Sequence, residues 1–122
     1  MTRLKLKSDR HFTVKGSLWI ECEGEKFFGP GPVELLERIQ TTGSISKAAK
    51  EMNLSYKKAW TMVNRLNSIA KVSLVATTPG GKEGGGSIVS EEAMMLISEY
   101  RRMRRTFNEF LETQTKIFNN NQ

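Results

Sequence analysis

Cationic and hydrogen-bonding side chains gather on one face of a short segment in the middle of the chain. Between Tyr56 and Ala70 the apolar residues recur at helical spacing, and no acidic residue interrupts the remaining polar face. This face consists of Lys57, Lys58, Thr61, Asn64, Arg65 and Ser68, with Tyr56 and Trp60 at its margins. Lys and Arg neutralise phosphates or contact guanine, Asn can pair with adenine, and hydroxyl groups bond phosphates. These residue types predict contact with DNA, and the alternative is the solvated polar face that any amphipathic helix has.

The distribution of charge along the chain favours a polyanionic partner. The 122 residues include 19 Lys and Arg against 13 Asp and Glu, which gives a net charge of +6. Residues 44–90 hold seven cations and two acids, whereas the five cations of residues 91–118 are cancelled by five acids. We therefore expect the surface for a polyanion to lie in the middle of the chain.

Two short helices joined by a tight turn are predicted to position the polar face. Ser44 can cap a helix over residues 45–52, and Ser55 can cap a second helix over residues 56–70, because a Ser hydroxyl accepts a hydrogen bond from an unpaired backbone N–H group. Asn53 can adopt the left-handed conformation that ends the first helix. This pattern is typical of a helix-turn-helix, in which the second helix enters the major groove.

A glycine-rich segment follows, between predicted strands at residues 73–78 and 87–89. Glycine leaves backbone N–H groups open to a phosphate or a minor groove, and Lys82 adds charge. A phosphate-binding nucleotide loop is excluded because G-x-x-x-x-G-K-[ST] does not occur and the segment does not open a helix. The hairpin is interpreted as a wing, with a loose turn as the alternative. Its candidate DNA contacts are Thr78, Gly80, Gly81, Lys82, Gly84 and Gly85.

The segments before this motif predict an arm, a hairpin and one more helix. Residues 1–11 are basic and are interpreted as a flexible arm. Alternating apolar residues predict a half-buried strand over residues 12–22 that returns over residues 26–28. After a break, a helix is expected over residues 32–41, with Pro32 at its first position and Gly43 closing its end.

A long helix is predicted after Ser90, over residues 91–118. Its apolar stripe alternates spacings of four and three, the repeat of a helix–helix seam, and a second copy of the chain is the simplest cover for it. The stripe consists of Leu96, Tyr100, Met103, Phe107, Phe110, Gln114 and Ile117. We therefore predict a homodimer. Arg101, Arg102, Arg104 and Arg105 flank the seam and are interpreted as a solvated helix face, and the tail 119–122 is expected to be disordered.

Composition excludes several functional classes. Cys22 is the only cysteine and His11 the only histidine, so structural zinc and Cys-His or Ser-His catalysis are not expected. Apolar stretches such as Ala93–Ile97 are far shorter than the roughly 20 residues of a membrane span, and the N-terminus lacks the apolar block of a signal peptide. We expect a soluble cytoplasmic protein that is not an enzyme and has no cofactor or metal.

Three motifs together resemble the N-terminal DNA-binding domain of ModE-type molybdenum-responsive regulators, which belong with the LysR-type winged helices. They are the stretch TGSISKAA at residues 42–49, LSYKKAW at 54–60 and GGKEGGG at 80–86. The resemblance implies a dimer that places residues 55–65 in the major groove, with the wing beside them. The candidate contacts in the helix-turn-helix are Ser44, Ser55, Tyr56, Lys57, Lys58, Trp60, Thr61, Asn64 and Arg65.

The chain departs from this family in two ways. Its members sense molybdate through β-barrel domains after the long helix, and this sequence ends at Gln122, so molybdate is not expected to bind it. The N-terminal hairpin is also more elaborate than in the full-length regulators.

The sequence as a whole predicts an α+β, mainly α, winged helix-turn-helix with an N-terminal β-hairpin and a long C-terminal dimerisation helix. Its parts are an arm at 1–11, a winged domain at 12–90, a dimerisation helix at 91–118 and a tail at 119–122. The predicted function is a stand-alone bacterial transcriptional regulator that binds double-stranded DNA and controls molybdate transport or metabolism. The alternative is a protein-interaction module that binds a partner subunit through the winged helix and the C-terminal helix.

Overall fold

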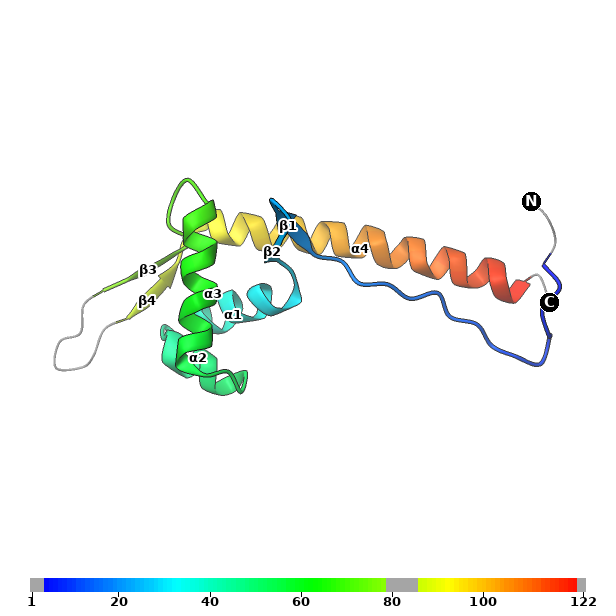
Figure 1. Cartoon of the computed structure of the whole chain (residues 1–122), viewed down its shortest axis with the longest axis horizontal. Coiled ribbons are helices and arrows are strands. Elements are labelled where there is room, and N and C mark those ends of the chain that lie inside the picture. The colour runs from blue at the N-terminus through cyan, green and yellow to red at the C-terminus, as the bar shows by residue number, and fades with distance from the viewer. Residues whose placement is uncertain (1–3, 79–85, 121–122) are drawn as a thin grey trace. The chain divides into compact units, whose positions relative to one another are not determined.

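The protein is described by a computed structural model, which covers residues 4–78 and 86–120 (Figure 1). Its elements follow the order of a winged helix-turn-helix preceded by a hairpin, which confirms the predicted α+β, mainly α class. They are β1 (Ile20–Cys22), β2 (Glu25–Phe28), α1 (Pro30–Thr42), α2 (Ile45–Glu51), α3 (Tyr56–Ile69), β3 (Val75–Thr77), β4 (Ser87–Val89) and α4 (Glu91–Asn120). The chain divides into two compact units. One is Trp19–Glu99, and the other combines Met1–Leu18 with Tyr100–Gln122, so α4 contributes to both.

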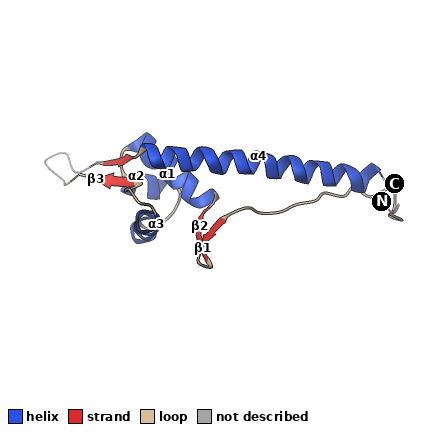
Figure 2. Cartoon of the chain, turned by 90° about the horizontal axis from the view of Figure 1, so that it is seen from above, coloured by secondary structure: helices blue, strands red, loops and turns tan. Residues whose placement is uncertain are grey.

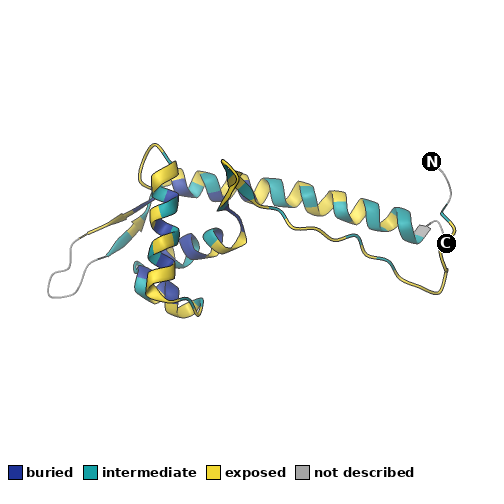
Figure 3. Cartoon of the chain, in the orientation of Figure 1, coloured by how far each residue is buried: buried dark blue, intermediate teal, exposed yellow. Residues whose placement is uncertain are grey.

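The core of the unit Trp19–Glu99 lies among the first three helices, the hairpins and the start of α4. Figure 3 shows buried positions on α1, α2 and α3. The largest fully buried side chains are Phe28, Leu35, Leu36, Ile39, Val63, Leu66 and Ile97. Fully burying an aliphatic side chain contributes about 1.5–3 kcal/mol, so this cluster is the main source of stability for the unit.

The helix-turn-helix forms as predicted, with both helices ending one residue earlier. The hydroxyl of Ser44 accepts from the backbone N–H of Lys47 at 3.1 Å, and the hydroxyl of Ser55 accepts from that of Lys58 at 3.0 Å. Asn53 takes a φ of 56°, the left-handed conformation expected at the turn. Small buried residues lie where the helices pack together, namely Ala48 and Ala49 on α2 and Ala59 on α3.

The first helix begins earlier than predicted, at Pro30 instead of Pro32. The expected break at residues 29–32 is confined to Gly29, the extended N-cap, because residues 30–32 belong to the first turn of α1. Pro30 and Pro32 both lack an N–H group, so two of the donors that a helix start leaves unpaired are absent. Gly29 accepts from the N–H of Val33 at 3.0 Å. At the other end, Gly43 has a φ of 69° and closes the helix as predicted.

An arginine joins the first two helices of this unit. Arg38 on α1 donates to Glu34 on the same helix and to Glu51 at the end of α2, each at 2.8 Å. These bonds raise the pKa of Arg38, first through Glu51 and then through Glu34. The two carboxylates thus favour the charged form of the guanidinium that joins α1 to α2.

The base of the wing is fixed to the end of α1. Strands β3 and β4 pair antiparallel, with Val75 opposite Val89 (Figure 2). The backbone N–H of Ser87 donates to the carbonyl of Gly43 at 2.9 Å, which joins β4 to the C-terminus of α1. The hydroxyl of Ser90 caps α4 by accepting from the N–H of Ala93, as predicted. The glycine-rich turn was predicted at residues 79–86, and all of it except Gly86 lies outside the described residues.

The long strand predicted over residues 12–22 is wrong for its first part, because only Ile20–Cys22 pairs as a strand. Residues 12–18, which we call the strap, run beside the second half of α4 (Figures 1 and 2). The alternation is real, with Phe12, Val14 and Leu18 half-buried and the residues between them exposed. The half-buried residues of the strap pack against helix α4 and not against a second strand.

Side chains of α4 hold the backbone of the strap. Asn119 accepts from the N–H of Phe12 at 3.0 Å and donates to its carbonyl at 2.9 Å. The hydroxyl of Tyr100 donates to the carbonyl of Leu18 at 2.8 Å. A side chain at Gly16 would meet the ring of Phe107, which is 2.8 Å from the position of a Cβ atom there. Asn119 belongs to helix α4, which ends at Asn120, two residues after the predicted end.

Candidate nucleic-acid interface

The predicted DNA-reading face of α3 is exposed. Lys57, Lys58, Thr61 and Asn64 are all exposed, whereas the apolar positions between them, Ala59, Val63 and Leu66, are buried in the core. Thr61 donates its hydroxyl to the carbonyl of Lys57 at 2.9 Å, which leaves the lone pairs of its oxygen available to other donors. The cationic groups near the start of α3 therefore face solvent, while the opposite side of the helix is packed into the core.

Two aromatic rings lie at the margin of this face. Tyr56 is 54% exposed, and its ring lies 6.0 Å from that of Trp60 at an interplanar angle of 43°. Trp60 is half-buried, so part of its ring remains open. The pair holds the Tyr56 hydroxyl at the N-terminal end of α3, where helix-turn-helix proteins make most of their base contacts.

The hairpin brings an acid to the far end of the face. Arg65 donates to Glu25 on β2, although no acid interrupts the face within α3 itself. The guanidinium side chain is 39% exposed, and its Nε is buried without a hydrogen-bond partner among the described residues. Arg65 is thus less available to a phosphate than Lys57 or Lys58. The sequence did not reveal this pair because its members are 40 positions apart.

Positive charge is concentrated on the helix-turn-helix within the unit Trp19–Glu99. Residues 44–90 carry a local excess of five positive charges. Residues 19–43 hold two cations and five acids, and residues 91–99 hold three acids without a cation. The acids therefore belong to the hairpin, α1 and the start of α4. This separation of charge gives the helix-turn-helix a positive surface in a unit that is nearly neutral overall.

A single amide joins the end of α3 to the base of the wing. The Asn67 side chain accepts from the backbone N–H groups of Leu74 and Val75, at 2.8 and 3.1 Å, and donates to the carbonyl of Val75 at 3.0 Å. Asn67 was missed by the sequence reasoning because an Asn on the flank of a helix has no distinctive pattern. It fixes the start of β3 relative to α3.

Replacing Asn67 by Ala is expected to lower the free energy of unfolding by about 2 kcal/mol, because it leaves two part-buried N–H groups without an acceptor. Asn67→Asp is the control that keeps the acceptor, although it replaces the donor to the Val75 carbonyl by a charged oxygen, and a smaller loss is expected. Urea denaturation measures both values. An equal effect of the two substitutions would show that the acceptor bonds to Leu74 and Val75 are not what stabilises this junction.

The predicted dimer seam is only partly exposed. Tyr100 and Phe107 contact the strap of their own chain. Phe110 is 55% exposed, and the remaining seam residues are half-buried: Leu96, Met103, Gln114 and Ile117. The strap therefore covers part of the stripe, and Phe110 is the large apolar residue that it leaves most open.

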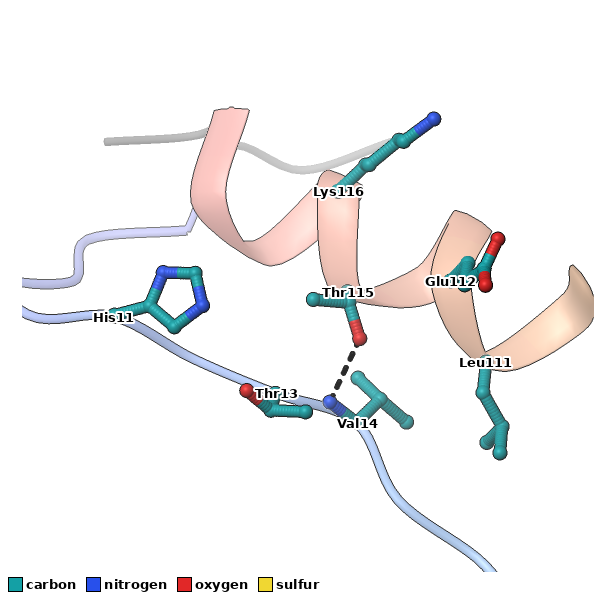
Figure 4. A pocket seen from close by; sticks show the side chains of 7 residues that line it. All are labelled: His11, Thr13, Val14, Leu111, Glu112, Thr115 and Lys116. Carbon is teal, nitrogen blue, oxygen red and sulfur yellow. Dashed lines mark hydrogen bonds between the residues drawn. The ribbon is translucent and has the colours of Figure 1, made fainter. Parts of the chain in front are cut away.

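An open pocket of about 360 Å³ lies between the strap and α4 (Figure 4). Its lining includes His11, Glu112 and Lys116, and the hydroxyl of Thr115 accepts from the backbone N–H of Val14 at 2.8 Å.

Among the described residues, no group of three His, Cys, Asp or Glu side chains could hold a metal ion. In the same part of the chain, no helix has both the length and the apolar composition to cross a membrane.

Comparisons with known proteins agree with this arrangement. Residues 32–83 match the model for the bacterial regulatory helix-turn-helix protein, LysR family. The chain is 36% identical over 83 residues to the DNA-binding transcriptional dual regulator ModE of Escherichia coli K12, an alignment that covers 68% of this chain and 32% of that protein. It is 38% identical over 89 residues to the transcriptional regulator ModE of Haemophilus influenzae, covering 73% and 35%.

A third relative is named for the molybdenum pterin that it binds. The molybdenum-pterin-binding protein MopB of Rhodobacter capsulatus is 38% identical over 91 residues, covering 75% of this chain and 34% of that protein. The chain therefore spans about a third of the length of these curated relatives. The chain therefore contains a match to the LysR-family bacterial regulatory helix-turn-helix at residues 32–83 and is homologous to the N-terminal region of the ModE regulators.

Proposed function

We propose that the chain is a sequence-specific DNA-binding transcriptional regulator of molybdenum-related genes, acting in the bacterial cytoplasm. One observation carries this proposal: the exposed, acid-free polar face of α3 within a LysR-family helix-turn-helix. The link to molybdenum comes from the relatives, which include transcriptional regulators and a molybdenum transport protein. The protein acts by binding and not by a chemical reaction.

Residues near the start of α3 read and grip the DNA in this proposal. Lys57 and Lys58 neutralise phosphates or contact guanine, Asn64 pairs with adenine, and Thr61 and Tyr56 bond phosphates. The capping residues Ser44 and Ser55 would lie where the first turns of α2 and α3 approach the sugar-phosphate backbone of the DNA. Arg65 takes part only when it exchanges Glu25 for a phosphate.

A homodimer would present two copies of α3 to one DNA duplex. The exposed ring of Phe110 and the half-buried Met103 and Ile117 are the part of the α4 seam that a second copy would cover. Two-fold symmetry of the protein then requires a roughly palindromic site, with half-sites about one DNA turn apart or a multiple of it.

Selection of genomic fragments by the purified chain, followed by sequencing, tests this proposal. The retained fragments are expected to share a roughly palindromic site upstream of genes for molybdenum transport or use. With about six phosphate contacts per dimer, the log of affinity should fall with the log of salt at a slope of about −5. A slope near zero, or retention without any shared sequence, would contradict DNA reading and favour a protein-interaction module. Asymmetric sites together with a monomer mass in solution would contradict the dimer.

A further inference from the structure

Most of the net positive charge lies outside the unit that carries the helix-turn-helix. Residues 19–99 contain nine Lys and Arg against ten Glu, a net charge of −1. In the other unit, the described residues 4–18 and 100–120 contain nine Lys and Arg against three acids, a net charge of +6. We call these two described ranges the basic unit. The high isoelectric point of the chain therefore comes mainly from the basic unit and not from α3.

Four arginines on α4 dominate the basic unit. At 100° per residue, Arg101, Arg102, Arg104 and Arg105 cover an arc of about 160° around the helix. Arg101, Arg102 and Arg105 are exposed, and Arg104 lies over the ring of Phe107, 5.7 Å from its centroid. Residues 99–109 contain these four arginines and only two acids, Glu99 and Glu109.

The strap and the segment before it add cations to this unit. Lys15 is exposed within the strap, and Lys5, Lys7 and Arg10 are exposed ahead of it. Against these four cations, residues 4–18 contain one acidic residue, Asp9, whose carboxylate lies 4.0 Å from the guanidinium of Arg10. The bonds from Asn119, Thr115 and Tyr100 hold the strap against α4, so its cations belong to the same compact unit as the arginines.

We propose that the basic unit is a second DNA contact, which binds the phosphate backbone without reading sequence. The inference rests on the proposed function, because α3 would supply the sequence-specific contact to the same DNA. Two contacts on one chain raise its overall affinity, since binding through one holds the other close to the same duplex. The basic unit would supply the general, salt-dependent attraction, and α3 would select the site.

The residue types favour phosphate groups of a nucleic acid over an anionic lipid surface. Four of the five cations that α4 contributes are Arg, whose planar guanidinium matches phosphate oxygens in a bidentate geometry. A peripheral helix on a membrane carries Lys and Arg on its polar face and a continuous apolar face on its other side, which enters the lipid. Here Phe110 is exposed opposite the arginine arc, but Tyr100 is buried and Phe107 lies against the strap, so the described part of α4 offers no continuous apolar face to a lipid.

The experiment measures binding of the full chain to a random-sequence duplex as a function of salt. The triple substitution Arg101→Gln, Arg102→Gln and Arg105→Gln is expected to weaken this binding by about tenfold or more and to reduce the salt slope by up to about 3. The matched control replaces the same three residues by Lys, which preserves the charge and should keep most of the affinity. Circular dichroism of both variants checks that α4 is intact.

The outcomes separate this inference from the proposed function. If the Gln variant keeps the affinity and the salt slope of the wild type, the basic unit does not contact DNA, although DNA binding through α3 stands. If the wild type binds neither random nor selected fragments, both proposals fail. Tighter binding to polyglutamate, or to vesicles containing phosphatidylserine, than to the duplex would overturn the inference by identifying an acidic protein or a membrane as the partner.

Discussion

Reversing the charge of Lys57 and Lys58 together is expected to abolish sequence-specific DNA binding. Both side chains are exposed on α3, and the Ser55 cap at the backbone of Lys58 fixes the first turn of the helix. Lys57→Glu with Lys58→Glu removes two phosphate or guanine contacts and places two carboxylates against the DNA. We expect at least about a thousandfold loss of affinity for a selected site, measured by gel shift or fluorescence anisotropy.

Two control variants show whether the position or only the charge matters. Lys57→Arg with Lys58→Arg keeps both charges and should retain affinity within about tenfold, since phosphate contacts survive the change. Lys26→Glu with Lys71→Glu changes the net charge equally but lies outside the reading face, so only a modest loss through the long-range field is expected. Equal losses in the two charge-reversed variants would mean that bulk charge, and not α3, drives binding.

Local signals were sufficient to predict the helix-turn-helix. Each helix has its own N-cap serine, the turn has Asn53 in the conformation that Asn tolerates, and the packing positions are small alanines. All of these act over a few residues, so they can be read without knowing the fold. For the same reason the predicted helix bounds were correct to within one residue, except at the start of α1 and the end of α4.

Features that depend on distant contacts were not predictable. Alternation over residues 12–18 fits any partner that covers one side of an extended chain, and a strand was predicted where the partner is α4. The Arg65–Glu25 pair and the bonds of Asn67 to β3 likewise join segments that a linear pattern does not relate. Charge was assigned along the sequence, whereas the strap and α4 combine their cations only once the chain has folded.

The second large effect is expected where α2 packs on α3. Ala59 is 0% exposed and lies directly beside Lys58 in sequence, with its side chain on the opposite, buried face of α3. Ala59→Leu adds three carbon atoms where the structure leaves no accessible surface. We expect a loss of about 3 kcal/mol in the free energy of unfolding, at the upper end of the range for overpacking a core, and a fall of about 15 °C in the midpoint of thermal unfolding.

DNA binding should fall together with stability in this variant, because α3 can accommodate the larger side chain only by moving away from the core into which Ala59 is buried. That movement displaces Lys57 and Lys58, which lie in the first turn of α3, from the positions in which they meet the DNA. Ala76→Leu is the matched control, since Ala76 is exposed on β3 and the same three carbons would lie in solvent. Its stability should change by less than about 0.5 kcal/mol. If Ala59→Leu were tolerated as well as Ala76→Leu, or lost stability while keeping full affinity for the selected site, the close packing of α3 on the core at Ala59 would not be what positions the reading face.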